Sequence, residues 1–229
     1  DGRGSFIQKG SNVSGLMLGA MRTSPNFNNF PYLDSATKLH RSYRYPQPPV
    51  LSARDGRGYD NPLFVIFAAK TPAETNRAYG NINLNYDATD WLKIDYTLGA
   101  DYFNNQLLDG LAQSSSTFST GEVFRTDGNN LQLDHNLTAT ARYSIGKILQ
   151  GSLTLGQNLN IRDYNTEAVT GQALTTPTPF TISNTATQAL PNTYRQSINL
   201  ESYFGQLQAE LWNQLALTAG LRRDGASTF

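Results

Sequence analysis

The sequence predicts an all-β fold of long antiparallel strands, of the kind found in a fragment of a transmembrane β-barrel. Three observations support this prediction. Apolar and polar residues alternate with a period of two over six segments. These segments run for about 9 to 14 residues, against about 9 to 11 for a tilted strand that crosses a membrane and about 5 to 6 for soluble strands. Short turns join the strands within each pair, whereas long connections join the pairs.

The first predicted hairpin covers residues 78–102. Apolar residues occupy the even positions of 78–86 and again of 92–102, while polar residues dominate the odd positions. The intervening residues 87–90 are of types that favour a turn. The second hairpin pairs 131–143 with 149–161 around residues 144–147, and the third pairs 203–211 with 215–223 around residues 212–214. We therefore expect six strands in three hairpins, with long loops near 104–130 and 162–193.

The apolar face of these strands is nearly uninterrupted, because only His135, Gln157 and Arg223 are polar on it. The apolar phase changes between Leu200 and Tyr203, which indicates either a β-bulge or the point where a strand leaves the membrane. Alternation alone does not decide which face meets solvent, since a soluble sandwich or small barrel packs its apolar face inward.

Aromatic side chains near both ends of the strands favour the membrane interpretation, because such rings form girdles at membrane interfaces. The polar face is rich in amide and hydroxyl groups and suits a hydrated lumen. We expect the following residues to face that lumen: Asn81, Asn83, Asp95, Asp101 and Arg142. Six strands are fewer than the eight of the smallest bacterial outer-membrane barrels, so we expect an arc of a larger barrel.

Residues 1–75 lack sustained alternation and contain interleaved prolines and aromatic residues. We expect them to form a structured extracellular loop region with a short helix near 10–21, followed by the barrel strands over 76–229. Because loops carry recognition, the candidates for facing a ligand or partner are Arg41, Tyr43, Arg44, Tyr45 and Tyr59. The alternative is that these rings anchor the loop on itself.

Composition excludes several function classes. The 229 residues include 18 basic and 18 acidic ones, so no net charge attracts nucleic acid. The chain has no cysteine, which rules out disulfides and thiolate chemistry within it. The longest apolar run, residues 63–69, is much shorter than the roughly 20 residues of a membrane-spanning helix.

No catalytic motif is present, so we predict that the chain is not an enzyme and uses no cofactor or metal. His40 and His135 are far apart in the sequence. Asp55, Asp60 and Asn61 have oxygen atoms that suit calcium, but the same spacing is common in plain turns.

Several short motifs, in order, resemble SusC/RagA-type TonB-dependent outer-membrane transporters. They are Gly-Ser-Asn-Val-Ser at 10–14, Arg-Thr at 22–23, Pro-Asn-Phe-Asn-Asn at 25–29, Asp-Asn-Pro at 60–62, Leu-Gly-Ala-Asp at 98–101 and Tyr-Phe-Gly-Gln-Leu at 203–207. The end of the chain is similar to the Arg-x-Asp-Gly-Ser-Ser motif of that family, although Ala226 stands where the family usually has serine.

This resemblance implies the middle of a barrel whose plug domain and remaining strands lie outside the chain. It also implies uptake of glycan fragments or peptides across the outer membrane of a Gram-negative bacterium of the Bacteroidota, with a SusD-like surface lipoprotein and TonB as partners. A siderophore or vitamin receptor, a porin barrel and a soluble β-barrel or sandwich binding module remain as alternatives.

Overall fold

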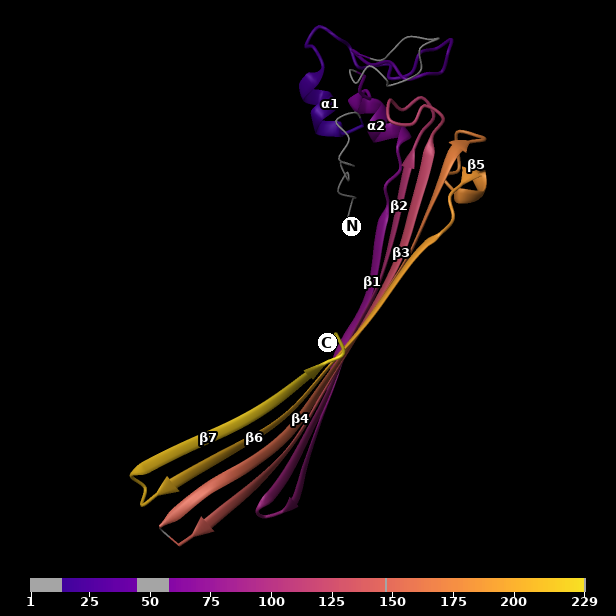
Figure 1. Ribbon diagram of the computed structural model, residues 1–229. Helices are drawn as coiled ribbons and strands as arrows, with labels where there is room; N and C mark the ends of the chain where they lie inside the picture. The colour runs from indigo at the N-terminus through magenta and orange to yellow at the C-terminus, as the bar shows by residue number, and fades with distance from the viewer. Residues whose placement is uncertain (1–13, 45–57, 147, 229) are drawn as a thin grey trace. The chain divides into compact units, whose positions relative to one another are not determined.

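The computed structural model describes residues 14–44, 58–146 and 148–228. Two short helices precede a series of long strands (Figure 1). The helices are α1 (Leu16–Arg22) and α2 (Pro62–Ala68), and a 3-10 turn, η2 (Ile182–Asn184), lies late in the chain. The strands are β1 (Ala73–Thr89), β2 (Leu92–Leu111), β3 (Glu122–Ile145), β4 (Leu149–Leu174), β5 (Thr185–Gln188), β6 (Asn192–Leu211) and β7 (Leu215–Ala226).

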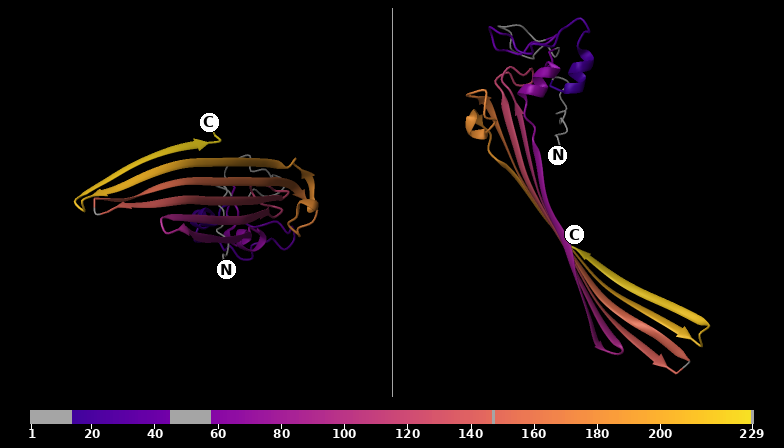
Figure 2. Two further views of the ribbon diagram at one scale, coloured as in Figure 1. Left: turned by 90° about the horizontal axis from the view of Figure 1, so that it is seen from below. Right: turned by 180° about the vertical axis from the view of Figure 1, so that it is seen from behind.

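The strands form one sheet in the order β1-β2-β3-β4-β6-β7, and the short β5 pairs with β4 off this path. Figure 2 shows the long strands side by side from two further directions. The predicted all-β fold class and the three hairpins are confirmed, with turns at the expected places. The last turn is tight, because Trp212 and Asn213 both adopt the left-handed conformation that matches strand twist. None of the described helices has the length and apolar character needed to cross a membrane.

The strands are longer than the sequence predicted, and the expected loops near 104–130 and 162–193 are correspondingly shorter. Strand β2 continues to Leu111, β3 begins at Glu122, β4 continues to Leu174 and β6 begins at Asn192. Beyond the apolar segments both faces of the sheet carry polar residues, so the alternating pattern ends while the backbone hydrogen bonds continue. The strand β5 was missed because its four residues show no alternation.

The register of β6 and β7 explains the phase change near Leu200. These strands pair without interruption from Leu211 opposite Leu215 to Leu200 opposite Ala226. The β-bulge interpretation is therefore wrong for this pair, because a bulge would place two residues opposite one. What changes at Leu200 is the chemistry of the side chains, as expected where the apolar band of a strand ends.

The apolar face of the sheet is open. Leu155 is 56% exposed, Leu217 is 52% exposed and Leu221 is 82% exposed. The small apolar core of the described chain centres instead on Val123, Leu174 and Phe180. A soluble sandwich would bury the leucine face under a second sheet, and the described strands form one sheet. This arrangement favours lipid as the medium that covers the leucine face.

Two of the three polar residues on the apolar face have hydrogen-bond partners on the same face. The Tyr96 hydroxyl lies 3.4 Å from His135 Nδ1. Gln157 Nε2 donates to Glu201 Oε1 at 2.9 Å and to the Tyr203 hydroxyl at 3.2 Å. These bonds lower the cost of placing polar groups on a face that meets lipid.

Gly151 permits a close approach between strands. The Tyr143 hydroxyl donates to the backbone oxygen of Gln208 at 3.1 Å, and a Cβ atom at Gly151 would lie 2.1 Å from that oxygen. We expect Gly151→Ala to lower the folded fraction of the full-length protein strongly, because the added methyl group would force the backbone at Gln208 to move. Heat-modifiable migration on a denaturing gel measures that fraction. Gly80→Ala is the matched control, because its Cβ meets nothing within 4 Å. Equal folded fractions for the two variants would contradict this packing.

The chain divides into two compact units. Among the described residues, the first, which we call the loop unit, contains 14–44, 58–75, 105–127 and 166–193, and the second, the strand unit, contains 76–104, 128–146, 148–165 and 194–228. The described residues of the expected loop region 1–75 group with the ends of β2, β3 and β4 and the connections that follow.

Candidate functional site

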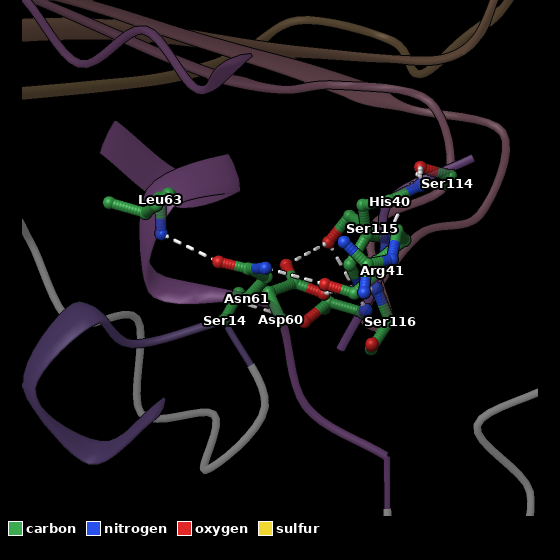
Figure 3. Close-up of polar contacts among 10 residues, drawn as sticks. Ser14, His40, Arg41, Asp60, Asn61, Leu63, Ser114, Ser115 and Ser116 are labelled. Carbon is green, nitrogen blue, oxygen red and sulfur yellow. Dashed lines mark hydrogen bonds and ion pairs between the residues drawn. The ribbon is translucent and has the colours of Figure 1, made fainter. Parts of the chain in front are cut away.

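A buried polar cluster holds three segments of the loop unit together (Figure 3). Asp60, only 1% exposed, is at its centre. Its Oδ2 accepts a hydrogen bond from the Ser115 hydroxyl at 2.7 Å, and its Oδ1 accepts one from the Ser116 backbone N–H at 2.6 Å. We call His40, Asp60, Asn61 and residues 114–116 the Asp60 cluster.

His40 joins a second segment to this cluster. Its backbone N–H donates to the Ser114 hydroxyl at 3.1 Å, and its ring Nδ1 lies 3.2 Å from the same oxygen. Its Nε2 is 3.4 Å from Asp60 Oδ1, and its ring stacks on Phe64 with centroids 4.5 Å apart. Burial lowers the pKa of His40 to about 4, although hydrogen bonds to the backbone of Ser114 and Tyr59 act in the opposite direction. Burial also disfavours the charged form of Asp60, and it therefore raises the pKa of that carboxyl.

Asn61 connects the start of α2 to two other parts of the loop unit. Its Oδ1 accepts the Leu63 backbone N–H at 2.8 Å and so caps α2, which has proline at its first position. Its Nδ2 donates to the backbone oxygens of Asn29 and Arg41 at 2.9 and 2.6 Å. Helix α1 packs on α2 (Figure 1), and a Cβ at Gly19 would lie 2.9 Å from the Asp60 backbone oxygen.

The Asp60 cluster contains the residue types of a serine hydrolase, but its burial excludes that chemistry. A catalytic serine has to reach a substrate carbonyl, whereas Ser114 is 3% exposed and His40 is 2% exposed. The Asp60 oxygens, which we considered for calcium, accept hydrogen bonds from the protein instead. The described residues contain no group of three or more acidic or histidine side chains placed to hold a metal. Asp55 lies outside the described residues.

The pKa of His40 predicts how the loop unit responds to acid. His40 has a pKa of about 6.5 when unfolded and about 4 in the fold, so its contribution to stability is complete above pH 6.5 and is lost as the pH falls through 4. The raised pKa of Asp60 acts in the opposite direction. We therefore expect the stability difference between wild type and His40→Gln, measured by hydrogen exchange of the α2 amides, to shrink between pH 6.5 and 4. A constant difference would contradict this assignment.

The loop residues expected to face a partner mostly anchor the loop on itself. Arg41 Nη1 donates to the Pro31 backbone oxygen at 2.7 Å, and its guanidinium lies 5.7 Å from the Phe27 ring centroid. Tyr43 packs edge-on against the same ring at 6.0 Å. Tyr59 was expected at the surface, but it is 2% exposed, and this prediction is wrong because the residue belongs to the loop core.

Two of these loop candidates are left. Arg44 is exposed, and Tyr43 keeps 46% of its surface exposed despite its contact with Phe27. Tyr45 lies outside the described residues. Arg44 and Tyr43 stay predictions for a surface that meets a partner.

The predicted lumen residues lie on the polar face of the strand unit, where most of them bond to polar side chains of the same or a neighbouring strand. Asn83 Oδ1 accepts from the Thr97 hydroxyl at 2.8 Å, and Asn83 Nδ2 donates to Asn81 Oδ1 at 3.0 Å. Asp101 accepts two hydrogen bonds from Arg77, at 2.9 and 2.6 Å.

The other two predicted lumen residues lie nearer the turns. Asp95 pairs with Lys93 at 2.8 Å, and Arg142 lines a hollow near the turns of β3–β4 and β6–β7. Arg77 and Lys93 were not predicted as partners, although both lie two positions from other polar-face residues.

A recess of about 640 Å³ on the same polar face was also missed. Its polar lining comes from β3, β4, β6 and β7. Of these, β4 and β6 are adjacent in the sheet, although β5 lies between them in the chain. We call it the strand recess, and its polar residues include Asp134, Asn160, Arg162, Ser202, Arg222 and Asp224. Only the period-two pattern, which puts these even-numbered residues on one face, could have pointed to it.

The fold defines a class, namely an open antiparallel sheet of the kind that forms part of a β-barrel wall. The chain is similar to three solved structures of RagAB, described as a peptide transporter, as a peptide importer in a closed-closed state and as a peptide importer in an open-open state. The TM-scores are 0.68, 0.68 and 0.67, with sequence identities of 15%, 16% and 16%. The matches cover 75%, 76% and 76% of this chain but 20%, 20% and 19% of the matched chains. The chain thus spans about a fifth of their length.

The family model for the TonB-dependent receptor-like β-barrel matches residues 13–229. The chain therefore belongs to this family, which confirms the resemblance seen in its motifs and places it in the outer membrane. The family is one of transporters and receptors and not a class of enzymes. Comparison with curated proteins returned no match.

Proposed function

We propose that the chain forms part of the wall of an outer-membrane importer that takes up peptides or glycan fragments. In this proposal TonB supplies energy from the periplasmic side, and a SusD-like lipoprotein covers the extracellular loops. The host is a Gram-negative bacterium of the Bacteroidota. Family membership and the likeness to structures described as a peptide transporter support the proposal.

The polar face of the strand unit is the observation that carries this proposal. It presents amides, hydroxyls and paired charges, such as Asn81, Asn83 and the Arg77–Asp101 pair. A hydroxylated or peptidic solute exchanges hydrogen bonds with such a surface without leaving its own polar groups unsatisfied. The opposite face carries leucines that suit lipid.

The loop unit supports the part of the proposal that concerns a partner. The Asp60 cluster gives the loops a fixed shape, and a fixed surface binds a partner at a lower entropic cost than a mobile one. Arg44 and Tyr43 are exposed on this unit and are our candidates for contact with the lipoprotein.

Uptake by cells tests the proposal. We expect deletion of the full-length gene to abolish uptake of fluorescent oligopeptides or oligosaccharides, and complementation to restore it. Loss of TonB should have the same effect as the deletion. Uptake that persists without TonB would indicate a porin, and a defect confined to iron or vitamin supply would indicate a siderophore or vitamin receptor.

A further inference from the structure

The strand recess contains two carboxylates that already accept hydrogen bonds from other residues of the protein. Asp134 accepts hydrogen bonds at both oxygens, from Asn158 Nδ2 at 2.8 Å and from Asn160 Nδ2 at 3.2 Å. Asp224 Oδ1 accepts from the Ser202 hydroxyl and from Arg222 Nε, the latter at 2.7 Å. Three of the four carboxylate oxygens therefore already accept hydrogen bonds from the protein.

The two guanidinium groups in the recess differ from the acids in this respect. Each guanidinium carries five N–H donors. Arg162 donates from Nε to Asn160 Oδ1 at 2.7 Å, and Arg222 donates from Nη2 to the Ser202 hydroxyl at 3.0 Å as well as from Nε to Asp224. Both side chains are exposed, so the terminal N–H groups not used in these bonds are open to a solute.

The recess thus offers N–H donors to whatever enters it, beside carboxylates that already accept hydrogen bonds from the protein. A carboxylate matches the planar fork of a guanidinium better than a neutral hydroxyl does, because it accepts two parallel, charge-assisted hydrogen bonds. Two arginines and two aspartates leave the recess without net charge. A bound carboxylate is then held by geometry and is not trapped by excess positive charge, as a solute in transit requires.

We propose that the strand recess binds the carboxylate group of a transported solute through Arg162 and Arg222. This proposal rests on the proposed function, because it assumes that the polar face lines the transport path. The carboxylate has two sources within the proposed substrates, namely the C-terminus of a peptide and a uronic acid of a glycan fragment.

Calorimetric titration of the full-length protein in detergent tests the proposal with three probes. They are penta-alanine with a free C-terminus, penta-alanine amide and trigalacturonate. Arg162→Gln and Arg222→Gln remove the donors. Arg223→Gln is the matched control, since the adjacent residue lies on the opposite face, across from Tyr203.

We expect the wild type to bind penta-alanine or trigalacturonate, and the one that binds identifies the source of the carboxylate. Each recess variant should raise the Kd about tenfold, as expected for loss of a hydrogen bond to a charged group, while Arg223→Gln should not change it. Penta-alanine amide should bind the wild type no more tightly than penta-alanine binds the recess variants.

Several results would overturn the proposal. They are equal affinity for the acid and the amide, unchanged Kd in both recess variants, and no binding of either carboxylate probe. A lowered melting temperature with unchanged Kd would also overturn it, because the recess would then hold another segment of the same protein. If wild-type cells still take up the solute when one of these results is found, only the recess proposal fails. If wild-type cells take up neither oligopeptides nor oligosaccharides, the proposed function fails.

Discussion

Leu137→Arg and Leu155→Arg should each block assembly of the full-length protein in the outer membrane. Both side chains lie on the apolar face, where they are 42% and 56% exposed. An arginine facing lipid near the middle of the bilayer costs about 2–4 kcal/mol. We therefore expect much less folded, protease-resistant barrel in outer-membrane fractions of either variant.

Thr138→Arg is the matched control for this prediction, because residue 138 follows Leu137 on β3 and lies on the polar face. An arginine there is hydrated, so assembly should stay near the wild-type level. Normal assembly of both leucine variants together with failed assembly of Thr138→Arg would show that the faces are assigned the wrong way round.

Asp60→Ala should loosen the loop unit while leaving the strands folded. The substitution removes the acceptor for two buried donors, Ser115 Oγ and the Ser116 backbone N–H. Buried donors without partners cost about 1–3 kcal/mol each, so the loop unit should lose about 2–6 kcal/mol of local stability. Hydrogen exchange of the Val65 amide, which bonds to the Asn61 backbone oxygen, reports this loss as at least tenfold faster exchange.

Asp34→Ala provides the control for the loop unit. Asp34 also accepts hydrogen bonds from nearby groups, namely Thr37 and the Ala36 backbone N–H, and these bonds lower the pKa of its carboxyl. It is only half-buried and its partners lie in its own turn, so water replaces the lost bonds and the effect stays within that turn. Similar exchange of the Val65 amide in the two variants would contradict a central role for Asp60.

The strands were predictable wherever one face is apolar, as the hairpin at 203–223 illustrates. Alternation fixes which side chains share a face, and β6 and β7 pair with apolar opposite apolar, as in Leu207 opposite Ala219. The outer parts of β2, β3 and β4 were not predictable from alternation, because polar residues on both faces give no periodic signal. Their backbone pairing depends on neighbouring strands that are distant in sequence.

The buried polar cluster could not be predicted for a related reason. Asp60 and Asn61 have the residue types of a turn or a calcium loop, and nothing local indicates that Ser115, 55 positions away, donates to Asp60. Tyr59 shows the same limit, since an aromatic residue in a proline-rich loop suits a binding surface as well as a loop core. The strand recess depends on pairing between β4 and β6, which the sequence alone does not establish.

We infer that the two faces of the sheet meet different media, lipid on one side and a hydrated lumen on the other. The chain has no cysteine, so a cysteine introduced at one position of 152–157 at a time places a spin label at a known position of the chain. Collision rates with oxygen, which enters lipid, and with a water-soluble nickel chelate measure the medium in the assembled outer-membrane protein. We predict that oxygen dominates at 153 and 155 and that nickel dominates at 152 and 154. Equal rates along the segment, or the opposite alternation, would contradict the account.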